Sequence, residues 1–264
     1  MEARPATPGD LDAIVELTRR YRRRLAEWCP VYFNPRHGAD EGHALWLEVL
    51  ITAPDHETVV LADDGHVVGF ANLIGWSDRT WVDDLCVDDD GRWSQTIPWL
   101  ADLSRPWITC VAVGDVARSA ALAAVGAEPA TTYFACSLPP VDAAPNPSSP
   151  IADFEPWPVA HTFAEAPFLP TAPGALVVSD GAGGYAVGSA GANPPIYDPG
   201  GSTCVVDTIR GADRSGLLQR AMGQAAARGD GQMVVTCGAA DEALRAILVD
   251  AGFEPQVDVF GRRP

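Results

Sequence analysis

The chain has 264 residues, of which 47% are hydrophobic and 20% charged, a composition typical of folded proteins and not of disordered ones. Its formal net charge of −17 argues against nucleic acid and anionic membranes as partners, because both are themselves negative. All 18 basic residues are arginines, which excludes sites that need a lysine amine, such as a PLP Schiff base or a Walker P-loop.

The first half of the chain begins with two predicted helices. Thr7 can cap a helix with Pro8 in its first position, and an apolar stripe follows from Leu11. A second helix is predicted over residues 41–50. After it, the pattern predicts a hairpin with an Asp-Asp-Gly turn and then one more strand, over residues 59–62, 67–71 and 81–87.

Two segments of the chain repeat one pattern. Residues 107–134 and 233–260 each contain an apolar strand with Thr-Cys, an Ala- and Leu-rich helix, a glycine, Glu-Pro and a strand that ends in phenylalanine. The glycines suit the left-handed conformation that ends a helix. One residue inserted between the Thr-Cys pair and the helix aligns the two segments. The chain is therefore predicted to hold two copies of one α/β unit.

A proline-rich stretch, residues 139–150, separates the copies and predicts a semi-rigid linker. We expect an N-terminal unit over residues 1–138 and a C-terminal unit over residues 151–264. The second unit is shortened at its start, where a proline-rich segment replaces the two opening helices. Its predicted strands and helix follow at residues 176–179, 185–189, 203–207 and 217–228.

This order of elements resembles that of the GNAT acetyltransferases. The resemblance is carried by Ala6-Thr7-Pro8-Gly9-Asp10-Leu11, by the hairpin at 64–70, by the strand at 82–87 and by the helix-Gly-Glu-Pro element of each half. It covers residues 1–138 well and 175–261 more loosely, so the chain resembles a tandem form of the GNAT superfamily. The resemblance implies an α/β fold of two units, each with a mixed, mostly antiparallel sheet flanked by helices.

The resemblance also implies acetyl-CoA as cosubstrate, its pyrophosphate held by a loop at a helix N-terminus. The second copy has two arginines and two glycines in this loop, and we expect it to bind the cosubstrate. The expected binding residues are Val206, Arg210, Gly211, Arg214, Ser215 and Gly216. In the first copy Arg92 matches the Arg/Gln position of the family, but Trp93, Gln95 and Ile97 replace the glycines. The motif is degenerate in both copies.

An aspartate is the expected base that takes a proton from the acceptor amine. Asp83 and Asp84 occupy adjacent strand positions, which predicts that one faces each side of the sheet. Asp207 is the candidate in the second copy. A solvated or hydrogen-bonded carboxylate is the alternative role for these aspartates. The tyrosine by which the family protonates the leaving thiolate is replaced by leucine in both copies, at Leu122 and Leu248.

Three further groups of residues have two interpretations or none. Residues 19–24 hold five arginines, which either attract an acidic ligand or form a wet helix face that pairs with carboxylates. The five tryptophans between 76 and 107 either pack in the core or line an acceptor pocket. The histidines lack ligand spacing, so no metal is expected. The six cysteines form no C-x-x-C and are typical of reduced core thiols.

Together, the residues and the resemblance predict an acyl-CoA-dependent N-acyltransferase that uses acetyl-CoA and a small-molecule amine. The alternative is a catalytically inactive GNAT-like protein that binds a metabolite or protein partner, which the lost glycines and tyrosine favour. A homodimer through exposed strand edges is a further open alternative. With neither a run of 18 apolar residues nor a basic start before an apolar segment, the sequence predicts a cytoplasmic protein.

Overall fold

The structure, a computed structural model, describes residues 1–53, 56–76, 78–141, 151, 154–155, 168–191 and 196–262. The chain divides into two compact units. Unit 1 comprises Met1–Ala130 and Asp258–Pro264, and unit 2 comprises Thr131–Val257. Most of the predicted linker at 139–150 lies outside the described residues, as does much of the segment 151–174.

Unit 1 contains a mostly antiparallel sheet with helices, as predicted. Its elements are β1 (Glu2–Pro5), α1 (Leu11–Trp28), α2 (Ala39–Thr52), β2 (His56–Asp63), β3 (His66–Gly75), β4 (Thr80–Val87), α3 (Trp93–Ala101), β5 (Trp107–Ala112) and α4 (Val116–Ala124). Neighbouring strands from β1 to β4 are antiparallel, whereas β4 and β5 are parallel. The predicted hairpin is the β2–β3 pair.

Within its described residues, unit 2 repeats this arrangement without the two opening helices. Its elements are most of β6 (Glu128–Ser137), β7 (Leu176–Ser179), β8 (Tyr185–Gly191), β9 (Ser202–Arg210), α5 (Arg214–Arg228), β10 (Asp230–Gly238), α6 (Glu242–Asp250) and the start of β11 (Glu254–Arg262). The pairs β7–β8, β8–β9 and β10–β6 are antiparallel, and the pair β9–β10 is parallel. The predicted fold class is therefore confirmed in both units.

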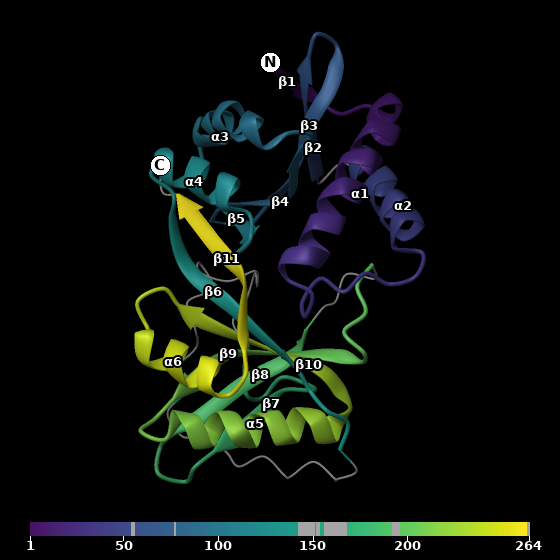
Figure 1. Cartoon of the computed structure of the whole chain (residues 1–264). Helices are drawn as coiled ribbons and strands as arrows, with labels where there is room; N and C mark the ends of the chain where they lie inside the picture. Colours follow the sequence, from purple (N-terminus) through teal and green to yellow (C-terminus); the bar gives the residue numbers. More distant parts are fainter. Residues whose placement is uncertain are drawn as a thin grey trace. The chain divides into compact units, whose positions relative to one another are not determined.

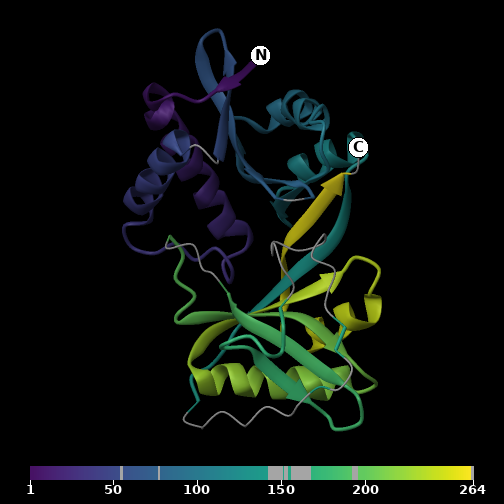
Figure 2. The ribbon, with the colours of Figure 1, turned by 180° about the vertical axis from the view of Figure 1, so that it is seen from behind.

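Helices cover both faces of the unit 1 sheet. α1 and α2 lie side by side over one face (Figures 1 and 2), with Ile14 and Leu47 packed near Phe70. α3 and α4 cover the other face over a core that includes Trp93 and Trp107. In unit 2, α5 and α6 cover one face of the sheet (Figure 1). We name each face by its helices: α1/α2, α3/α4 and α5/α6.

The last strand of each copy belongs to the other unit. β6 ends the first copy, yet it counts with unit 2 from Thr131 on, and its Phe134 packs in the core under α5 and α6. β11 ends the second copy, yet it counts with unit 1 from Asp258 on, and its Phe260 joins the core under α3 and α4. In the hydrogen-bonded strand order, β11 is next to β5 and β6 is next to β10. Each unit is thus completed by a strand of the other copy.

The strand registers correct the alignment of the two copies. β4 and β5 pair up to Val82 and Thr109, and β9 and β10 pair up to Val206 and Val235. Thr109 and Val235 therefore hold the same place, 126 residues apart, which is also the spacing of the two helix-ending glycines. The expected one-residue insertion is wrong. Matching the Thr-Cys pairs would turn the side chains of one strand to the opposite face.

A β-bulge overturns the orientation predicted for Asp83 and Asp84. Val82 and Leu85 both pack in the α3/α4 core although they lie three residues apart, and the β3–β4 register shifts at this point. Both aspartates therefore fall between two residues that face the same side, and the prediction that one faces each side of the sheet is wrong. The extra residue of the bulge breaks the alternation. Asp84 has a φ of 45°, in the left-handed region.

Candidate functional site

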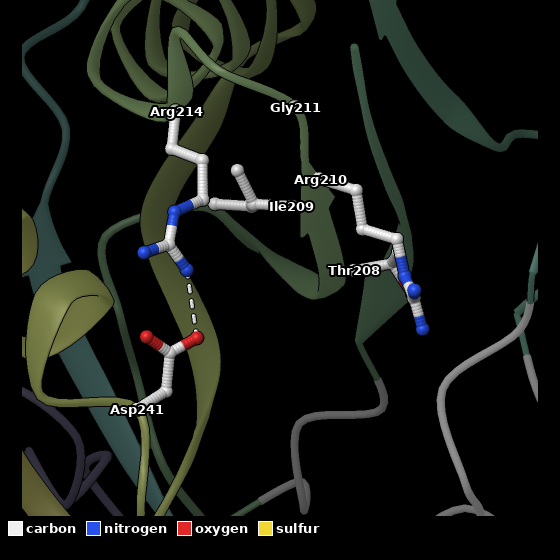
Figure 3. Close-up of a pocket in the computed structure, with 6 residues that line it drawn as sticks. All are labelled: Thr208, Ile209, Arg210, Gly211, Arg214 and Asp241. Atoms are coloured by element: carbon white, nitrogen blue, oxygen red, sulfur yellow. Dashed lines mark hydrogen bonds and ion pairs between the residues drawn. The ribbon is translucent and has the colours of Figure 1, made fainter. Parts of the chain in front are cut away.

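In unit 2 the sheet opens where β9 and β10 stop pairing. Their last paired residues are Val206 and Val235, although β9 continues to Arg210 and β10 to Gly238. A cavity of about 490 Å³ lies at the end of β9 and the start of α5 (Figure 3). It is lined by Thr208, Ile209, Arg210, Gly211, Arg214 and Asp241. The predicted loop therefore borders a real cavity.

Two features shape the loop between β9 and α5. Gly211 has a φ of +126°, and a Cβ atom there would lie 2.6 Å from the Cα of Gly184, so only glycine fits. Asp213 caps α5, because its carboxylate accepts a hydrogen bond from the amide of Gly216 at 2.8 Å. The partly positive N-terminus of α5 thus points to this end of the cavity with one of its amides already used.

Both arginines of the cavity are paired with carboxylates. Arg214 Nη1 lies 2.7 Å from Asp241 Oδ2, and in Figure 3 its side chain turns toward Asp241. Arg210 points away from that pair, and its Nη1 lies 2.6 Å from Glu155 Oε2. Both pairs are partly exposed, and such pairs are weak and exchange readily with other anions. Asp241 is also the N-cap of α6.

Asp207 follows the last paired residue of β9 and lies on a bulge. The β8–β9 register shifts there, so that Val206 and Ile209 both pack in the α5/α6 core. The Asp207 side chain accepts hydrogen bonds from the Thr208 hydroxyl at 3.0 Å and from the Phe168 amide at 3.3 Å. Burial raises the pKa of Asp207 to about 6, because the charged carboxylate loses hydration.

A buried hydroxyl lies on β10, directly after the last residue that pairs with β9. Thr236 follows Val235, the last residue of β10 that pairs with β9, just as Asp207 follows Val206. Val235 and Val206 both face α5 and α6, so Thr236 and Asp207 share the opposite face. Thr236 is 2% exposed, and its Oγ1 has no hydrogen-bond partner within the described ranges. An unpaired buried hydroxyl costs about 1–3 kcal/mol, which favours a ligand group at this position.

Unit 1 opens in the same way, but its opening contains a buried arginine. β4 and β5 stop pairing after Val82 and Thr109. Arg118 of α4, which is 2% exposed, donates from Nη2 to Thr109 Oγ1 at 2.6 Å and from Nη1 to the Leu85 carbonyl at 3.3 Å. Its guanidinium also lies 5.3 Å from the ring centre of Trp93. One side chain therefore bridges the two separated strands.

The α1/α2 face of unit 1 has a chain of buried polar groups that ends at Asp84. Arg22 Nη1 lies 2.7 Å from His43 Nδ1, and His43 Nε2 lies 3.2 Å from Asp84 Oδ2. A guanidinium has only donors, so Nδ1 must accept and His43 must donate from Nε2 to Asp84. Asn72 Nδ2 donates to the same carboxylate at 3.3 Å. Asp84 is thus a carboxylate fixed by buried neighbours.

Asp83, its neighbour on β4, has a strongly raised pKa. Burial, and after it the charge of Asp84, raises the pKa of Asp83 to about 8. The side chain is therefore mostly protonated at neutral pH. Asp83 follows the last paired residue of β4 just as Asp207 follows that of β9, so the two predicted bases hold the same place in the two units.

The loop of unit 1 is acidic and tied to its own surroundings. Arg92 lies 2.9 Å from Asp63 and 2.8 Å from Asp88. Asp90 accepts two hydrogen bonds of 2.7 Å from Arg24. Trp93, where the resemblance implies a glycine, is 1% exposed and packs in the α3/α4 core. The arginine of this loop is thus held by carboxylates, and a tryptophan fills the place of a small residue.

The structure brings together only part of the predicted set. Arg210, Gly211 and Arg214 line the cavity, and Asp207 lies on the strand that leads to it. Val206 is a core residue, Ser215 is exposed, Gly216 serves the helix cap, and Arg92 belongs to unit 1. Sequence reasoning missed four residues that bear on the two openings: Arg118, Glu155, Thr236 and Asp241. Of these four, only Arg118 could have been found from the sequence. It is a charged residue at a position of the repeat where the second copy has an apolar one, Leu244.

The other residue groups follow the simpler of their two interpretations. Four arginines of residues 19–24 pair with carboxylates: Arg19 with Glu16 and Asp40, Arg20 with Glu16, Arg22 with Asp40, and Arg24 with Asp90. Three of the clustered tryptophans are buried: Trp76, Trp93 and Trp107. All six cysteines are free, and five are buried. In the described part of the chain no helix is long and apolar enough to cross a membrane.

No protein-family model matches the sequence, and no curated protein sequence matches it. Solved structures do match. A Thermoplasma acidophilum protein named as an acetyltransferase is similar over 100% of both chains, with a TM-score of 0.55 and 11% sequence identity. A GCN5-related N-acetyltransferase from Sphaerobacter thermophilus covers 100% of this chain and 96% of its own, with a TM-score of 0.53 and 15% identity.

A tandem GNAT protein from the clavulanic acid biosynthesis pathway matches 99% of this chain and 98% of its own, with a TM-score of 0.45 and 17% identity. At such low identities the two higher TM-scores show a shared architecture and say nothing about substrates. This chain therefore has the fold of the GNAT acetyltransferases.

Proposed function

We propose that this chain is an acyl-CoA-dependent N-acyltransferase, with acetyl-CoA as its cosubstrate and a small-molecule amine as its acceptor. The observation that carries the proposal is the coincidence of three features in unit 2. The parallel strands β9 and β10 separate, a cavity with two arginines lies at the end of β9, and a buried aspartate follows the last paired residue. Each of these features has a distinct task in acyl transfer.

The residues of unit 2 fit an acyl-CoA. Arg210 and Arg214 would bind the pyrophosphate by giving up their exchangeable carboxylate partners, next to the N-terminus of α5. Gly211 allows a ligand to approach the backbone closely. The Thr236 hydroxyl, which has no partner among the described residues, gives the opening a hydrogen-bonding group for a ligand. Acyl-CoA, when bound, supplies the activated acyl group.

Asp207 is the proposed base. With a pKa of about 6 it is mostly ionised at neutral pH and a stronger base than an ordinary aspartate, so it can accept the proton that the amine nitrogen releases as it attacks the acyl carbon. The hydrogen bonds from Thr208 and Phe168 hold the carboxylate in place. In unit 1, Asp83 is mostly protonated at neutral pH, so it is a poorer candidate for the same role.

One observation favours a second function, the binding of a metabolite or partner without turnover. Leu248, which is fully buried, occupies the place where the resemblance implies a tyrosine that protonates the leaving thiolate. Arg210 and Arg214, which we call the cradle, also pair with Glu155 and Asp241, and Asp213 adds a third carboxylate to the same loop. Both features would lower turnover or affinity without removing the cavity.

Thermal unfolding with acetyl-CoA tests the proposal. A ligand at about 100 times its Kd stabilises the folded state by roughly 2.7 kcal/mol, which shifts the Tm by several degrees. The double variant Arg210→Ala, Arg214→Ala should lose the shift. Arg92→Ala, which removes a loop arginine of unit 1, should keep it. A shift that survives the double variant would contradict the proposed cradle.

Turnover separates the two functions. Release of free thiol from acetyl-CoA, measured across a panel of small amines, should appear with the wild-type chain and fall strongly in Asp207→Asn. Because Asn keeps the size of the side chain, a Tm shift with acetyl-CoA should survive in this variant. A clear shift in the wild type with no thiol release from any amine would favour the non-catalytic function.

A further inference from the structure

The two openings of the sheet differ in one side chain that bridges them. Helices α4 and α6 begin alike: Asp115 accepts a hydrogen bond from the amide of Arg118, and Asp241 accepts one from the amide of Leu244. Arg118 and Leu244 therefore hold the same place in the two helices. The first can donate to both separated strands, whereas the second can donate to neither.

Arg118 is built into unit 1 as a permanent component. Its guanidinium donates to Leu85 on β4 and Thr109 on β5, the two strands that bound the opening. It also donates to the Tyr21 hydroxyl at 3.1 Å, and that hydroxyl donates to Asp115 at 3.0 Å. A buried guanidinium of this kind is costly to displace, because moving it breaks three hydrogen bonds of one buried charged group at once.

The loop at the end of β4 adds a second obstacle, which is electrostatic. Asp88, Asp89 and Asp90 precede its single arginine, and Asp89 already accepts the amide of Gly91 at 2.8 Å. The arginine itself is held by Asp63 and Asp88. A pyrophosphate at this loop would meet three consecutive aspartates and one arginine, whereas residues 210–214 of unit 2 contain two arginines and one aspartate, so the repulsion is larger in unit 1.

We infer that unit 1 does not accept an acyl-CoA, because the Arg118 guanidinium occupies the opening between β4 and β5, and that the chain binds one acyl-CoA, in unit 2. This inference rests on the proposed function for the second part only. The two units would then differ in role although they share a fold. The opening between β9 and β10 in unit 2 stays free for a ligand, whereas the opening between β4 and β5 in unit 1 is filled by side chains of the protein.

Two measurements on the wild-type chain test the inference. Native mass spectrometry with acetyl-CoA should show a single bound molecule per chain at saturation. Hydrogen exchange at short times, when only local openings contribute, should show protection by acetyl-CoA over residues 202–228 and unchanged exchange over residues 80–101. CoA without the acetyl group should give the same pattern, since the cradle arginines contact its phosphates.

The variant Arg210→Ala, Arg214→Ala is the matched control and should lose both the bound molecule and the protection. Two molecules per chain, or protection over residues 80–101, would overturn the inference while leaving the proposed function standing. No bound acetyl-CoA in the wild type would overturn the proposed function together with the count of one.

Discussion

Unit 1 and unit 2 share the arrangement of their strands and differ in what occupies the opening between the two parallel strands. Each has a bulged strand, a parallel partner that separates after one defined residue pair, and an aspartate directly after that pair. In unit 1 the opening contains Arg118, whereas in unit 2 it leads to a cavity. The same backbone arrangement can therefore be present with or without a binding site, because a few side chains are enough to close the site.

The largest expected effect comes from the exchanged phenylalanines. Phe134→Ala and Phe260→Ala should each cost about 3–5 kcal/mol of unfolding free energy, because both side chains are buried in a core. Phe134→Ala should speed hydrogen exchange in α5 of unit 2, and Phe260→Ala should do so in α3 of unit 1. Urea unfolding gives the total cost. Faster exchange only in unit 1 for Phe134→Ala, or only in unit 2 for Phe260→Ala, would contradict the assignment of β6 and β11 to the two units.

Removing the bridge in unit 1 should have the next largest effect. Arg118→Leu copies the residue of unit 2 and should destabilise the chain by about 2–3 kcal/mol, because Thr109 and the Leu85 carbonyl lose a buried charged donor. Leu244→Met, at the same place in unit 2, conserves volume and should cost less than about 1.5 kcal/mol. Equal costs in chemical denaturation would show that Arg118 is an ordinary packing residue.

The two aspartates should give different pH dependences of stability. Each has a pKa above its usual 3.8, so the folded chain keeps a proton that the unfolded chain loses, and stability falls as the pH rises through this window. The window runs from about pH 4 to about 6 for Asp207 and from about pH 4 to about 8 for Asp83.

The stability of Asp207→Asn relative to the wild type should therefore rise between about pH 4 and about pH 6. Above pH 6 the difference should stay constant, at no more than about 3 kcal/mol. For Asp83→Asn the gain should continue to grow toward about pH 8. Tm measured against pH for both variants checks this. A gain for Asp207→Asn that is the same at pH 4 and pH 7 would contradict the raised pKa.

The smallest effect concerns the charge around the cradle. Asp241→Asn keeps the cap of α6, since asparagine caps helices well, but removes the carboxylate that holds Arg214. Acetyl-CoA affinity should rise about threefold, in line with the modest strength of an exposed pair. Asp115→Asn, at the cap of α4, should leave affinity unchanged. Calorimetric titration of both variants provides the comparison, and a weaker Kd for Asp241→Asn would argue against competition.

Local patterns in the sequence predicted most of the fold. The hairpin at Asp63-Asp64-Gly65 forms as predicted. Pro8 begins a short 3-10 helix, Pro8–Asp10, that leads directly into α1, so the start of the first helix is also predicted closely. The exchange of β6 and β11 could not be predicted. Both strands follow the same helix-Gly-Glu-Pro element and end in phenylalanine, so neither carries a mark that says which sheet it joins.

The candidate site was predictable only where it is local. Arg210, Gly211 and Arg214 lie within one loop, and their glycine and arginine content marked the place. Glu155 is 55 residues from Arg210 in the sequence, and Asp241 is 27 residues from Arg214. No spacing rule connects such pairs. The bulges also escaped prediction, because the orientation of Asp83 and Asp84 was predicted from regular alternation, which one extra residue in the strand breaks.

The exchange of strands also sets an order of events in time. Residues Asp258–Arg262 complete unit 1, and in the chain they follow all of unit 2. During synthesis, the first copy must therefore wait with an open edge at β5 until the whole of unit 2 has been made. A truncated chain that contains only the first 130 residues would therefore lack the last strand of unit 1. Unit 1 can therefore be completed only in a chain that also contains unit 2.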